Sequence, residues 1–537
     1  MQIIIEKQAV MVAKDCTLLN CIKDDEKKSI YAAIVNGKLQ DLRYRVNEDD
    51  HIEWVYEDSD IGKQIYERSL SFLFIAAVAK VFQDEHVIIE HALSNGLFCR
   101  LQKKAYLVVS DVARIEACMR EMVAAKLEIK RHIVKTNDAI TFFKQQGYAY
   151  KAELLNYRKS LESSVYELDG VYDYFYGIML YDTSYLTHFK LRYYAPGIWL
   201  SPQSKWVNQA KLFEVFQAFE QWGRLIGITN VSQLNHMIEV GKLDEYVLMS
   251  ETMAEKKLED ITCDIVTTYP NTKFIMIAGP SSAGKTTFAR RLAIHLRIHG
   301  KKPLAISMDD FYHNREDCKK LADGSYDFDS LEAIDLDLFN ETLLKLLHQI
   351  PVRMPIYNFK TGKREWHEKE FISSEDQIFI IEGIHGLNPQ SSLCIPEDAK
   401  YKIYINALTH LNLDDHNRIP TSDYRLLRRI TRDYQFRGWN ASDTIRFWKN
   451  VRDAEDQYIY PYQEEANAIF NSSMVYELSV IKPIVIPLLE QVTPDCKEYL
   501  EAHRLLKLME YFAEGRSEAI PRSSILAEFI GNSIFDV

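Results

Sequence analysis

The sequence lacks paired cysteines and any segment that would direct it to a membrane. Its eight cysteines are scattered over 537 residues, and none stands in a C-x-x-C pair. In a chain of this length, that pattern argues against a disulfide framework or a zinc knuckle and favours reduced thiols. Met1 to Val12 contain no basic segment followed by an apolar core, and the longest apolar stretch, near residues 71–82, is too short to span a bilayer. We therefore expect a cytoplasmic protein without membrane contact.

An excess of positive charge, internal repeats and low-complexity tracts are also missing. The formal net charge is −12, which argues against a general nucleic-acid coat protein but leaves a specific RNA contact open. Hydrophobic residues make up 47% of the chain, enough for packed cores, and the length suggests three or four domains.

One short run carries most of the chemical information. Residues 279–287 read Gly-Pro-Ser-Ser-Ala-Gly-Lys-Thr-Thr and fit the pattern G-x-x-x-x-G-K-[ST]. An apolar run, Phe274 to Ala278, precedes it as a predicted strand, and residues 286–300 follow with helical spacing. A strand, a glycine-rich turn and a helix N-terminus together bind phosphate, so we expect ATP here. The predicted phosphate-binding residues are Gly279, Pro280, Ser281, Ser282, Ala283, Gly284, Lys285, Thr286 and Thr287.

The pattern around this run predicts a domain of alternating strands and helices from residue 271 to 480. Strands are expected at 274–278, 304–308, 378–381 and 401–405, which favours a P-loop NTPase α/β fold with a doubly wound parallel sheet. A helical connector is expected over 236–270 and a helical tail over 481–537, in which prolines mark breaks. Residues 1–60 read as a small mixed module with strands expected at 2–5 and 30–35. Residues 61–235 mix helix and strand patterns, and an amphipathic helix is expected over 112–130.

Two carboxylates are expected at the ends of strands beside the phosphate loop. Asp309 follows the second strand, where ligands bind in such sheets, and it is the candidate catalytic base, with Asp310 as the alternative. Glu382 ends the next strand, and with Thr286 it is a candidate Mg²⁺ ligand. Lys285 is expected to neutralise the β- and γ-phosphates during transfer.

Arginines are concentrated in one later segment with helical spacing. They can clamp a transferring phosphoryl group, in the manner of a lid, although a solvated basic face is the ordinary alternative. The residues are Arg425, Arg428, Arg429, Arg432 and Arg437.

Taken together, these motifs resemble the uridine kinase / phosphoribulokinase family of P-loop kinases. The resemblance covers 271–480 and includes Met308-Asp309-Asp310-Phe311-Tyr312, Phe328-Asp329, Pro355-Ile356-Tyr357-Asn358-Phe359 and Glu382-Gly383-Ile384. It implies that Asp309 is the catalytic base and that Asp329 and Tyr357, with Arg364 beside them, bind the nucleoside. It also implies that Arg429 contacts the substrate and that Arg432 and Arg437 act in catalysis.

The sequence departs from the uridine kinase pattern at three positions. Asn358 stands where those enzymes have aspartate, Gly362 where they have a base-binding histidine, and Trp439 where they have a second lid arginine. The run Glu-Gly-Ile-His that ends at His385 is similar to the Glu-Gly-Leu-His run of phosphoribulokinases. The alternative is therefore a kinase whose acceptor is a sugar or a sugar phosphate.

The front of the chain resembles threonyl-tRNA synthetases. Residues 1–60 are similar to their small TGS module and 61–235 to their editing domain, through stretches such as 90–97 and 150–154. The editing site of that family uses H-x-x-x-H with a later cysteine and histidine, and here the four positions are His91, Asn95, Phe175 and Met179. A single histidine cannot build a zinc site, so we expect neither a metal centre nor hydrolytic editing.

The sequence thus predicts a kinase that uses ATP and Mg²⁺ to phosphorylate the 5′-hydroxyl of a ribonucleoside, uridine or cytidine first. We also expect a homo-oligomer, with residues 1–235 available to RNA, to an effector or to structural contacts. A third reading is an ATP-dependent RNA-binding switch that has no small-molecule acceptor.

Overall fold

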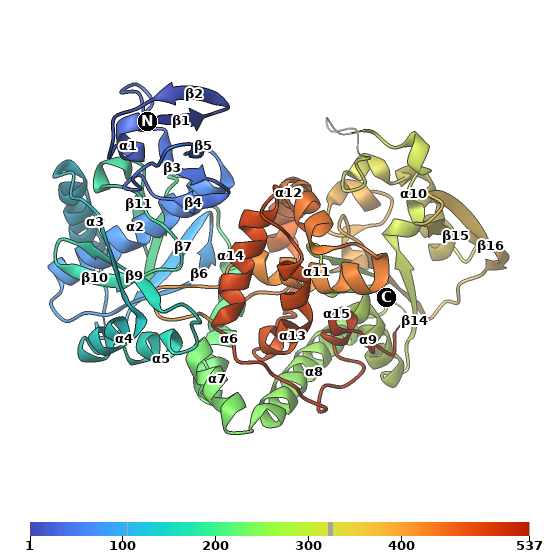
Figure 1. The fold of residues 1–537 in the computed structure, drawn as a ribbon. Helices are drawn as coiled ribbons and strands as arrows, with labels where there is room; N and C mark the ends of the chain where they lie inside the picture. Colours follow the sequence, from blue (N-terminus) through green and yellow to red (C-terminus); the bar gives the residue numbers. More distant parts are fainter. Residues whose placement is uncertain (105, 321–325, 536–537) are drawn as a thin grey trace.

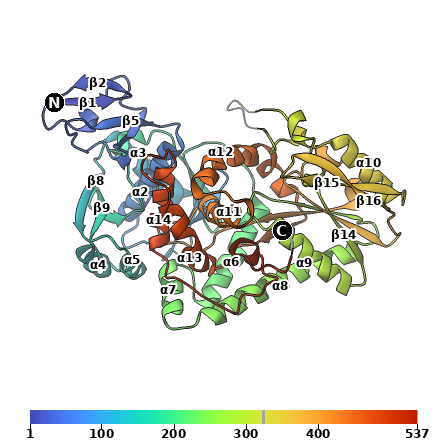
Figure 2. The ribbon, with the colours of Figure 1, turned by 45° about the vertical axis from the view of Figure 1, so that its right-hand side comes forward.

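The chain forms two halves joined by a layer of helices. The computed structural model describes residues 1–104, 106–320 and 326–535. In Figures 1 and 2 the first 200 residues lie at one end and the strand-rich domain of residues 274–406 at the other. Helices α11 to α14 lie between them in both views. No helix within the described ranges combines the length and apolarity needed to cross a bilayer.

The N-terminal module is a five-stranded sheet of order β2-β1-β5-β3-β4. Strands β1 and β5 pair in parallel, and the others pair antiparallel. The strands predicted at 2–5 and 30–35 are confirmed residue for residue. The elements are β1 (Gln2–Ile5), β2 (Gln8–Met11), α1 (Leu18–Cys21), β3 (Ile30–Val35), β4 (Lys38–Gln40) and β5 (His51–Tyr56).

The second module is built around the long helix α2 (Asp60–Val81), which begins at the Ser59 N-cap. Two antiparallel sheets of orders β11-β12-β7-β6 and β10-β9-β8 complete it. The predicted helix over 112–130 is shorter in the structure, because β8 begins at Lys130. The remaining elements are β6 (Val87–Leu93), β7 (Gly96–Leu101), α3 (Val109–Ala124), β8 (Lys130–Lys135), α4 (Thr136–Gln145), α5 (Ala149–Leu155), β9 (Glu162–Leu168), β10 (Val171–Tyr174), β11 (Lys190–Tyr194) and β12 (Gly197–Ser201).

Three helices lead from this module to the second half of the chain: α6 (Ala210–Ile226), α7 (Val231–Glu239) and α8 (Leu243–Thr268). The connector is therefore mainly one 26-residue helix, α8.

The second half contains a five-stranded sheet of order β14-β17-β13-β18-β19, in which every pairing is parallel. All five residues of the central strand β13 are buried, as an apolar strand covered on both faces requires. The four predicted strands are confirmed within two residues, whereas β19 and the hairpin β15–β16 were not predicted. The strands are β13 (Phe274–Ala278), β14 (Lys302–Ser307), β15 (Val352–Asn358), β16 (Lys363–Phe371), β17 (Gln377–Glu382), β18 (Lys400–Asn406) and β19 (Ala468–Asn471).

The helices of this half include two inside the sheet domain and five in its later part. Helix α13 passes through Pro483 and Pro487, so the expectation that these prolines break the tail is wrong. The helices are α9 (Lys285–Ile298), α10 (Leu336–Leu347), α11 (Thr421–Arg437), α12 (Ala441–Tyr458), α13 (Glu477–Glu490), α14 (Tyr499–Glu510) and α15 (Ala527–Ile530). Short 3₁₀ turns are η1 (Thr183–Tyr185), η2 (Met308–Phe311), η3 (Arg315–Asp317), η4 (Leu331–Ala333), η5 (Pro389–Ser392), η6 (Glu397–Ala399) and η7 (Tyr460–Glu465).

Buried polar contacts tie the two halves together. Lys151 of the front half forms an ion pair with Asp173, and Asp173 also accepts from Nδ1 of His416 at 2.5 Å. All three side chains are buried. Since His416 belongs to the second half, this cluster crosses the junction.

Candidate active site

The glycine-rich loop runs from the end of β13 to the start of α9. Gly284 has φ of +83°, and a Cβ there would lie 2.4 Å from Cγ2 of Ile525. A Cβ at Gly279 would lie 2.0 Å from the carbonyl oxygen of Ile405. Both glycines are thus required by the backbone path. Lys285 Nζ donates to the carbonyl oxygens of Gly279 and Pro280 at 2.9 and 3.2 Å, and Thr286 follows in the first turn of α9, partly exposed.

Two carboxylates meet at the adjacent ends of β14 and β17. Ser307 pairs with Glu382 in the parallel register, and its hydroxyl donates to Glu382 Oε1 at 3.0 Å. Asp309 lies two residues further, in η2. Burial raises the pKa of Asp309, and burial together with the Asp309 charge raises the pKa of Glu382 to about 7. Burial likewise lowers the pKa of Lys285, while Glu382 and Asp309 oppose that change. The loop lysine and both carboxylates therefore share one desolvated site.

This set of groups suits a divalent cation. Carboxylate and hydroxyl oxygens are the ligands that Mg²⁺ prefers, and Glu382, Thr286 and Asp309 supply them beside the loop. Burial raises the pKa of both carboxyls by disfavouring their charged forms, and the Lys285 charge opposes that rise. A bound cation would oppose it further.

Asp310 has a different task from its neighbour. Its Oδ1 accepts the Tyr357 N–H at 3.1 Å and so holds strand β15 against η2. Within the described ranges no backbone N–H donates to the Asp309 carboxylate, which leaves it available to an acceptor.

The rings of Tyr312, Tyr357 and Phe359 pack together beside η2, and we call this cluster the aromatic corner. The Tyr357 ring lies 5.5 Å from Tyr312 and 5.0 Å from Phe359, and its buried hydroxyl has no hydrogen-bond partner within the described ranges. Burial raises the pKa of Asp329 to about 6, and the Arg429 charge opposes that rise. Asp329 and Arg429 therefore act on each other across this corner.

Arg364 is engaged by another side chain. Its Nη1 lies 2.9 Å from Oδ2 of Asp335, and Asp335 caps helix α10 through the Leu338 N–H. Asn358, which follows Tyr357, accepts from the N–H groups of Lys360 and Thr361 at 3.1 and 3.2 Å. Asn358 thus stabilises the hairpin turn.

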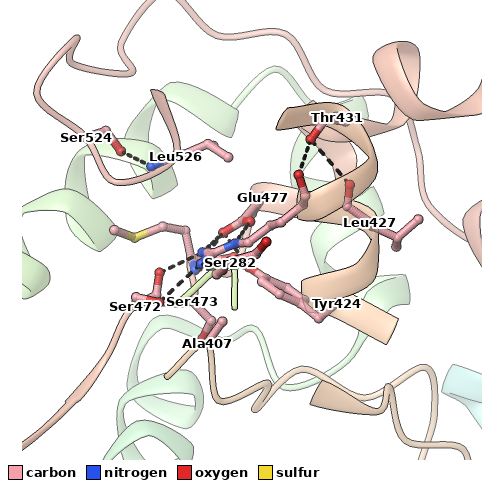
Figure 3. A network of polar contacts seen from close by, with 12 residues as sticks. Ser282, Ala407, Tyr424, Leu427, Thr431, Ser472, Ser473, Glu477, Ser524 and Leu526 are labelled. Carbon is pink, nitrogen blue, oxygen red and sulfur yellow. Dashed lines mark hydrogen bonds and ion pairs between the residues drawn. The ribbon is translucent and has the colours of Figure 1, made fainter. Parts of the chain in front are cut away.

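The arginines of helix α11 fall into two groups: two form buried ion pairs with distant glutamates, and three surround Asp433. Arg425 pairs with Glu455 at 2.6 Å and donates to the Ser281 carbonyl at 2.9 Å. Arg428 pairs with Glu477 and donates to the Ser282 carbonyl at 3.2 Å. Both arginines are buried in these pairs, so the expectation that they belong to a phosphate clamp is wrong. Figure 3 shows Glu477 among Ser282, Ser472 and Tyr424.

The three later arginines share one buried carboxylate. Asp433 lies 3.2 Å from Arg429, 2.9 Å from Arg432 and 3.6 Å from Arg437. Arg429 also donates to the Ser281 hydroxyl at 2.8 Å, which places it at the loop. Burial and the Arg432 charge lower the pKa of Arg437 to about 10, so positive charge is concentrated here. These three are the arginines that remain available to phosphate.

Several residues of the site carry no motif. Glu455 accepts the Ser281 N–H at 2.8 Å, and Glu528 accepts the Thr287 hydroxyl at 2.6 Å. The latter contact brings the last part of the tail onto the start of α9. Glu455 and Glu528 both stand in helices, and their local sequence does not predict these two contacts.

Aromatic side chains pack around His91, at the position that corresponds to the first histidine of the editing site in threonyl-tRNA synthetases. His91 stacks on Phe216, with ring centroids 4.0 Å apart and planes at 7°, and burial lowers its pKa to about 3. Phe175 and Met179 are buried, while Asn95 lies in a turn with φ of 58°.

Comparison with known proteins agrees with this geometry. Residues 274–479 match the model of the Phosphoribulokinase / Uridine kinase family. This part of the chain is a domain of that family. The curated protein uridine-cytidine kinase-like 1 of Mus musculus is 31% identical over 198 residues, which are 36% of this chain and 32% of that protein.

The front half matches threonine–tRNA ligases. That of Carboxydothermus hydrogenoformans is 30% identical over 173 residues, which are 32% of this chain and 27% of the ligase. The chain thus spans about a quarter to a third of the length of these curated relatives. Among solved structures, a possible uridine kinase from Bacillus stearothermophilus is 18% identical with a TM-score of 0.29, over 40% of this chain and 98% of that one.

Proposed function

We propose that this protein transfers the γ-phosphoryl group of ATP to the 5′-hydroxyl of a ribonucleoside, with uridine and cytidine as the first candidates. The observation that carries the proposal is the meeting of Lys285, Asp309 and Glu382 in one desolvated site, beside the aromatic corner that holds Asp329 and Tyr357. A phosphate cradle alone would serve any nucleotide hydrolase, whereas a free carboxylate facing a lined corner suits an acceptor.

Each residue has a defined task in this account. The N–H groups of the loop and Lys285 hold the triphosphate, and Asp309 orients the acceptor hydroxyl and takes its proton. Asp329, with Tyr357, binds the nucleoside. Arg429, Arg432 and Arg437 stabilise charge on the transferring group.

Mg²⁺ is the expected metal cofactor. Thr286 and Glu382 would hold it, and it would neutralise phosphate charge as the bond to the leaving group breaks.

A sugar or sugar phosphate is the second acceptor class, and one observation favours it. Gly362 stands where uridine kinases have a base-binding histidine, so this position offers no side chain to a base, and the neighbouring Asn358 is occupied by the hairpin turn. The remaining acceptor groups, Asp309 and Asp329, suit sugar hydroxyls of either class.

The acceptor class is tested by mass spectrometry of reaction products. Purified protein and Mg²⁺–ATP are incubated separately with uridine, cytidine, purine nucleosides, ribose and ribulose 5-phosphate. Lys285→Ala is the inactive comparison, and Lys256→Ala, an exposed lysine of α8, is the matched control. A nucleoside 5′-monophosphate formed by wild type and by Lys256→Ala alone supports the proposal. Phosphorylation of ribulose 5-phosphate or ribose, but of no nucleoside, replaces it by the second class.

A further inference from the structure

A large cavity lies at the junction of the two halves, away from the phosphate loop. Its volume is ≈ 760 Å³, within the range of small-molecule sites. It is enclosed by the N-terminal sheet, helix α2 and the 158–178 segment on one side, and by helices α12 and α14 on the other. Figure 1 shows α14 and α12 between the front half and the sheet of the second half.

The charge of this cavity is opposite to that of the chain. Nine lysines and arginines line it, against five aspartates and glutamates, although the whole protein has a net charge of −12. Seven of the nine cations have no carboxylate oxygen of the described residues within 4.0 Å, among them Arg68, Arg158, Arg452 and Lys507. Elsewhere the protein pairs buried arginines with carboxylates, as in Arg425–Glu455. Arg68, Arg158 and Arg452 are partly buried, whereas the four unpaired lysines are exposed at the cavity rim. Partly buried cations without a carboxylate partner favour an anionic ligand.

A bound anion would stabilise the charged forms of two of these cations, Arg68 and Lys507. Arg68 donates to the Ile178 carbonyl at 2.6 Å and lies against Gly177, where a Cβ would be 2.6 Å from its guanidinium carbon. Burial and the neighbouring Arg158 lower the pKa of Lys507, and burial lowers the pKa of Arg68. A phosphate group between such residues would gain charge-assisted hydrogen bonds.

The cavity also offers planar surfaces. Tyr499 and His503 of α14 are stacked with centroids 5.5 Å apart and planes at 13°, and both are partly exposed. The buried Trp448 of α12 lies at the cavity wall behind them. Cations combined with rings suit a phosphorylated nucleoside better than a simple anion.

One helix connects this cavity to the phosphate loop. Trp448, Arg452 and Glu455 are spaced by four and three residues, so they follow one stripe of α12. Trp448 and Arg452 line the cavity, and Glu455 accepts the Ser281 N–H of the loop. Arg425 and Arg429, which contact Ser281, also lie over the Trp448 ring, at 5.2 and 5.9 Å. A ligand that shifts α12 would therefore act directly on the loop.

We propose that this junction cavity is a second nucleotide site, which takes a free nucleoside triphosphate and communicates with the phosphate loop through α12. The binding itself does not depend on the catalytic activity proposed above.

The experiment is carried out in full-length Lys285→Ala protein, so that the phosphate loop is weakened. ATP is titrated by isothermal calorimetry, with inorganic tripolyphosphate and a 12-nucleotide RNA as comparison ligands. Arg158→Ala/Lys507→Ala removes two cavity cations, and Arg452→Ala removes one from α12. Arg297→Ala/Lys256→Ala removes two exposed cations outside the cavity and is the matched control. Circular dichroism checks that each variant is folded.

The proposal predicts that ATP binds the Lys285→Ala protein once per chain, more tightly than tripolyphosphate. Arg158→Ala/Lys507→Ala and Arg452→Ala should each weaken that binding about tenfold or more, and the matched control should not. Equal binding by all variants would overturn the site. Binding of RNA without binding of ATP, or equal affinity for tripolyphosphate, would overturn the ligand class.

Communication is tested by hydrogen exchange in the same proteins. ATP at the cavity should alter exchange in peptides covering α12 and residues 279–287, and Arg158→Ala/Lys507→Ala should abolish both changes. Changes in the cavity peptides alone would leave a binding site but overturn its link to the loop. Because these readouts need no turnover, a failure of the kinase proposal would be seen separately, in the acceptor assay.

Discussion

The Glu455 carboxylate accepts the Ser281 N–H of the phosphate loop at 2.8 Å while it forms a two-point ion pair with Arg425. Helices α12 and α11 thus hold the loop together, α12 through the acceptor Glu455 and α11 through the cation Arg425. Arg425 in turn donates to the Ser281 carbonyl, so both backbone groups of Ser281 are fixed by the same pair. A loop fixed in this way needs little reorganisation when it receives phosphates.

Glu455→Ala should strongly destabilise the protein. It leaves the Arg425 guanidinium buried without its charge partner, a change that costs about 3–5 kcal/mol. Thermal unfolding should show the transition of the second half lowered by roughly 6–20 °C. Asp24→Ala, which breaks the exposed Lys27–Asp24 pair, is the control and should leave that transition unchanged. Equal shifts for both variants would contradict the structural role of the Arg425 pair.

Asp309→Asn should abolish transfer while ATP binding is retained. The amide keeps the shape of the side chain but cannot take the acceptor proton, so kcat should fall by about 10²–10⁴-fold. Asp310→Asn is the comparison, because Asp310 only accepts the Tyr357 N–H. Its main effect should be on the KM for the acceptor. Initial rates with saturating ATP separate the two, and a larger loss of kcat in Asp310→Asn would reverse the assignment.

Acceptor binding should weaken in acid through Asp329. Burial raises the pKa of this carboxyl to about 6, and only its ionised form accepts two hydrogen bonds from ligand hydroxyls. Affinity is therefore full above pH 7 and is lost as the pH falls through 6. At pH 5 the KM for the acceptor should be about tenfold higher than at pH 7.5. Asp329→Asn should have a high KM at every pH, and a wild-type profile that it shares would exclude Asp329 as the titrating group.

Gly284→Ala should disrupt the phosphate loop. The residue has φ of +83°, and the new methyl would lie 2.4 Å from Ile525. Gly300→Ala shares the positive φ, at +73°, but nothing lies within 4 Å of its Cβ. The control should lose about 1 kcal/mol and keep ATP binding, whereas Gly284→Ala should lose ATP binding. Calorimetric titration with ATP measures both, and retained affinity in Gly284→Ala would show that Ile525 moves aside.

Local patterns predicted the sheet and the loop well, for physical reasons. The strand over 274–278 is apolar on both faces and the glycine-rich turn has one backbone path, so each is defined by neighbouring residues. The partners of buried charges were not predictable in this way. Arg425 and Arg428 look like a basic helical face, but Glu455 and Glu477 lie 30 and 49 residues away and neutralise them.

The contacts of the C-terminal tail were even less predictable from the sequence. Glu528 reaches Thr287 across 241 residues of sequence, and a short helix near the C-terminus gives no sign of it. Pro483 and Pro487 argued for a break, yet α13 continues through both, with its other face buried against the core. Tertiary packing outweighs the local preference there.

A kinase of this kind turns over ATP only when an acceptor is bound, and the rate of ADP formation reports this. Purified protein with Mg²⁺–ATP is assayed with and without saturating uridine or cytidine, beside Asp309→Asn. We expect a nucleoside to raise the rate of ADP formation at least 100-fold and Asp309→Asn to abolish the increase. An equal rate with and without any acceptor would contradict this expectation and would favour a nucleotide-dependent switch.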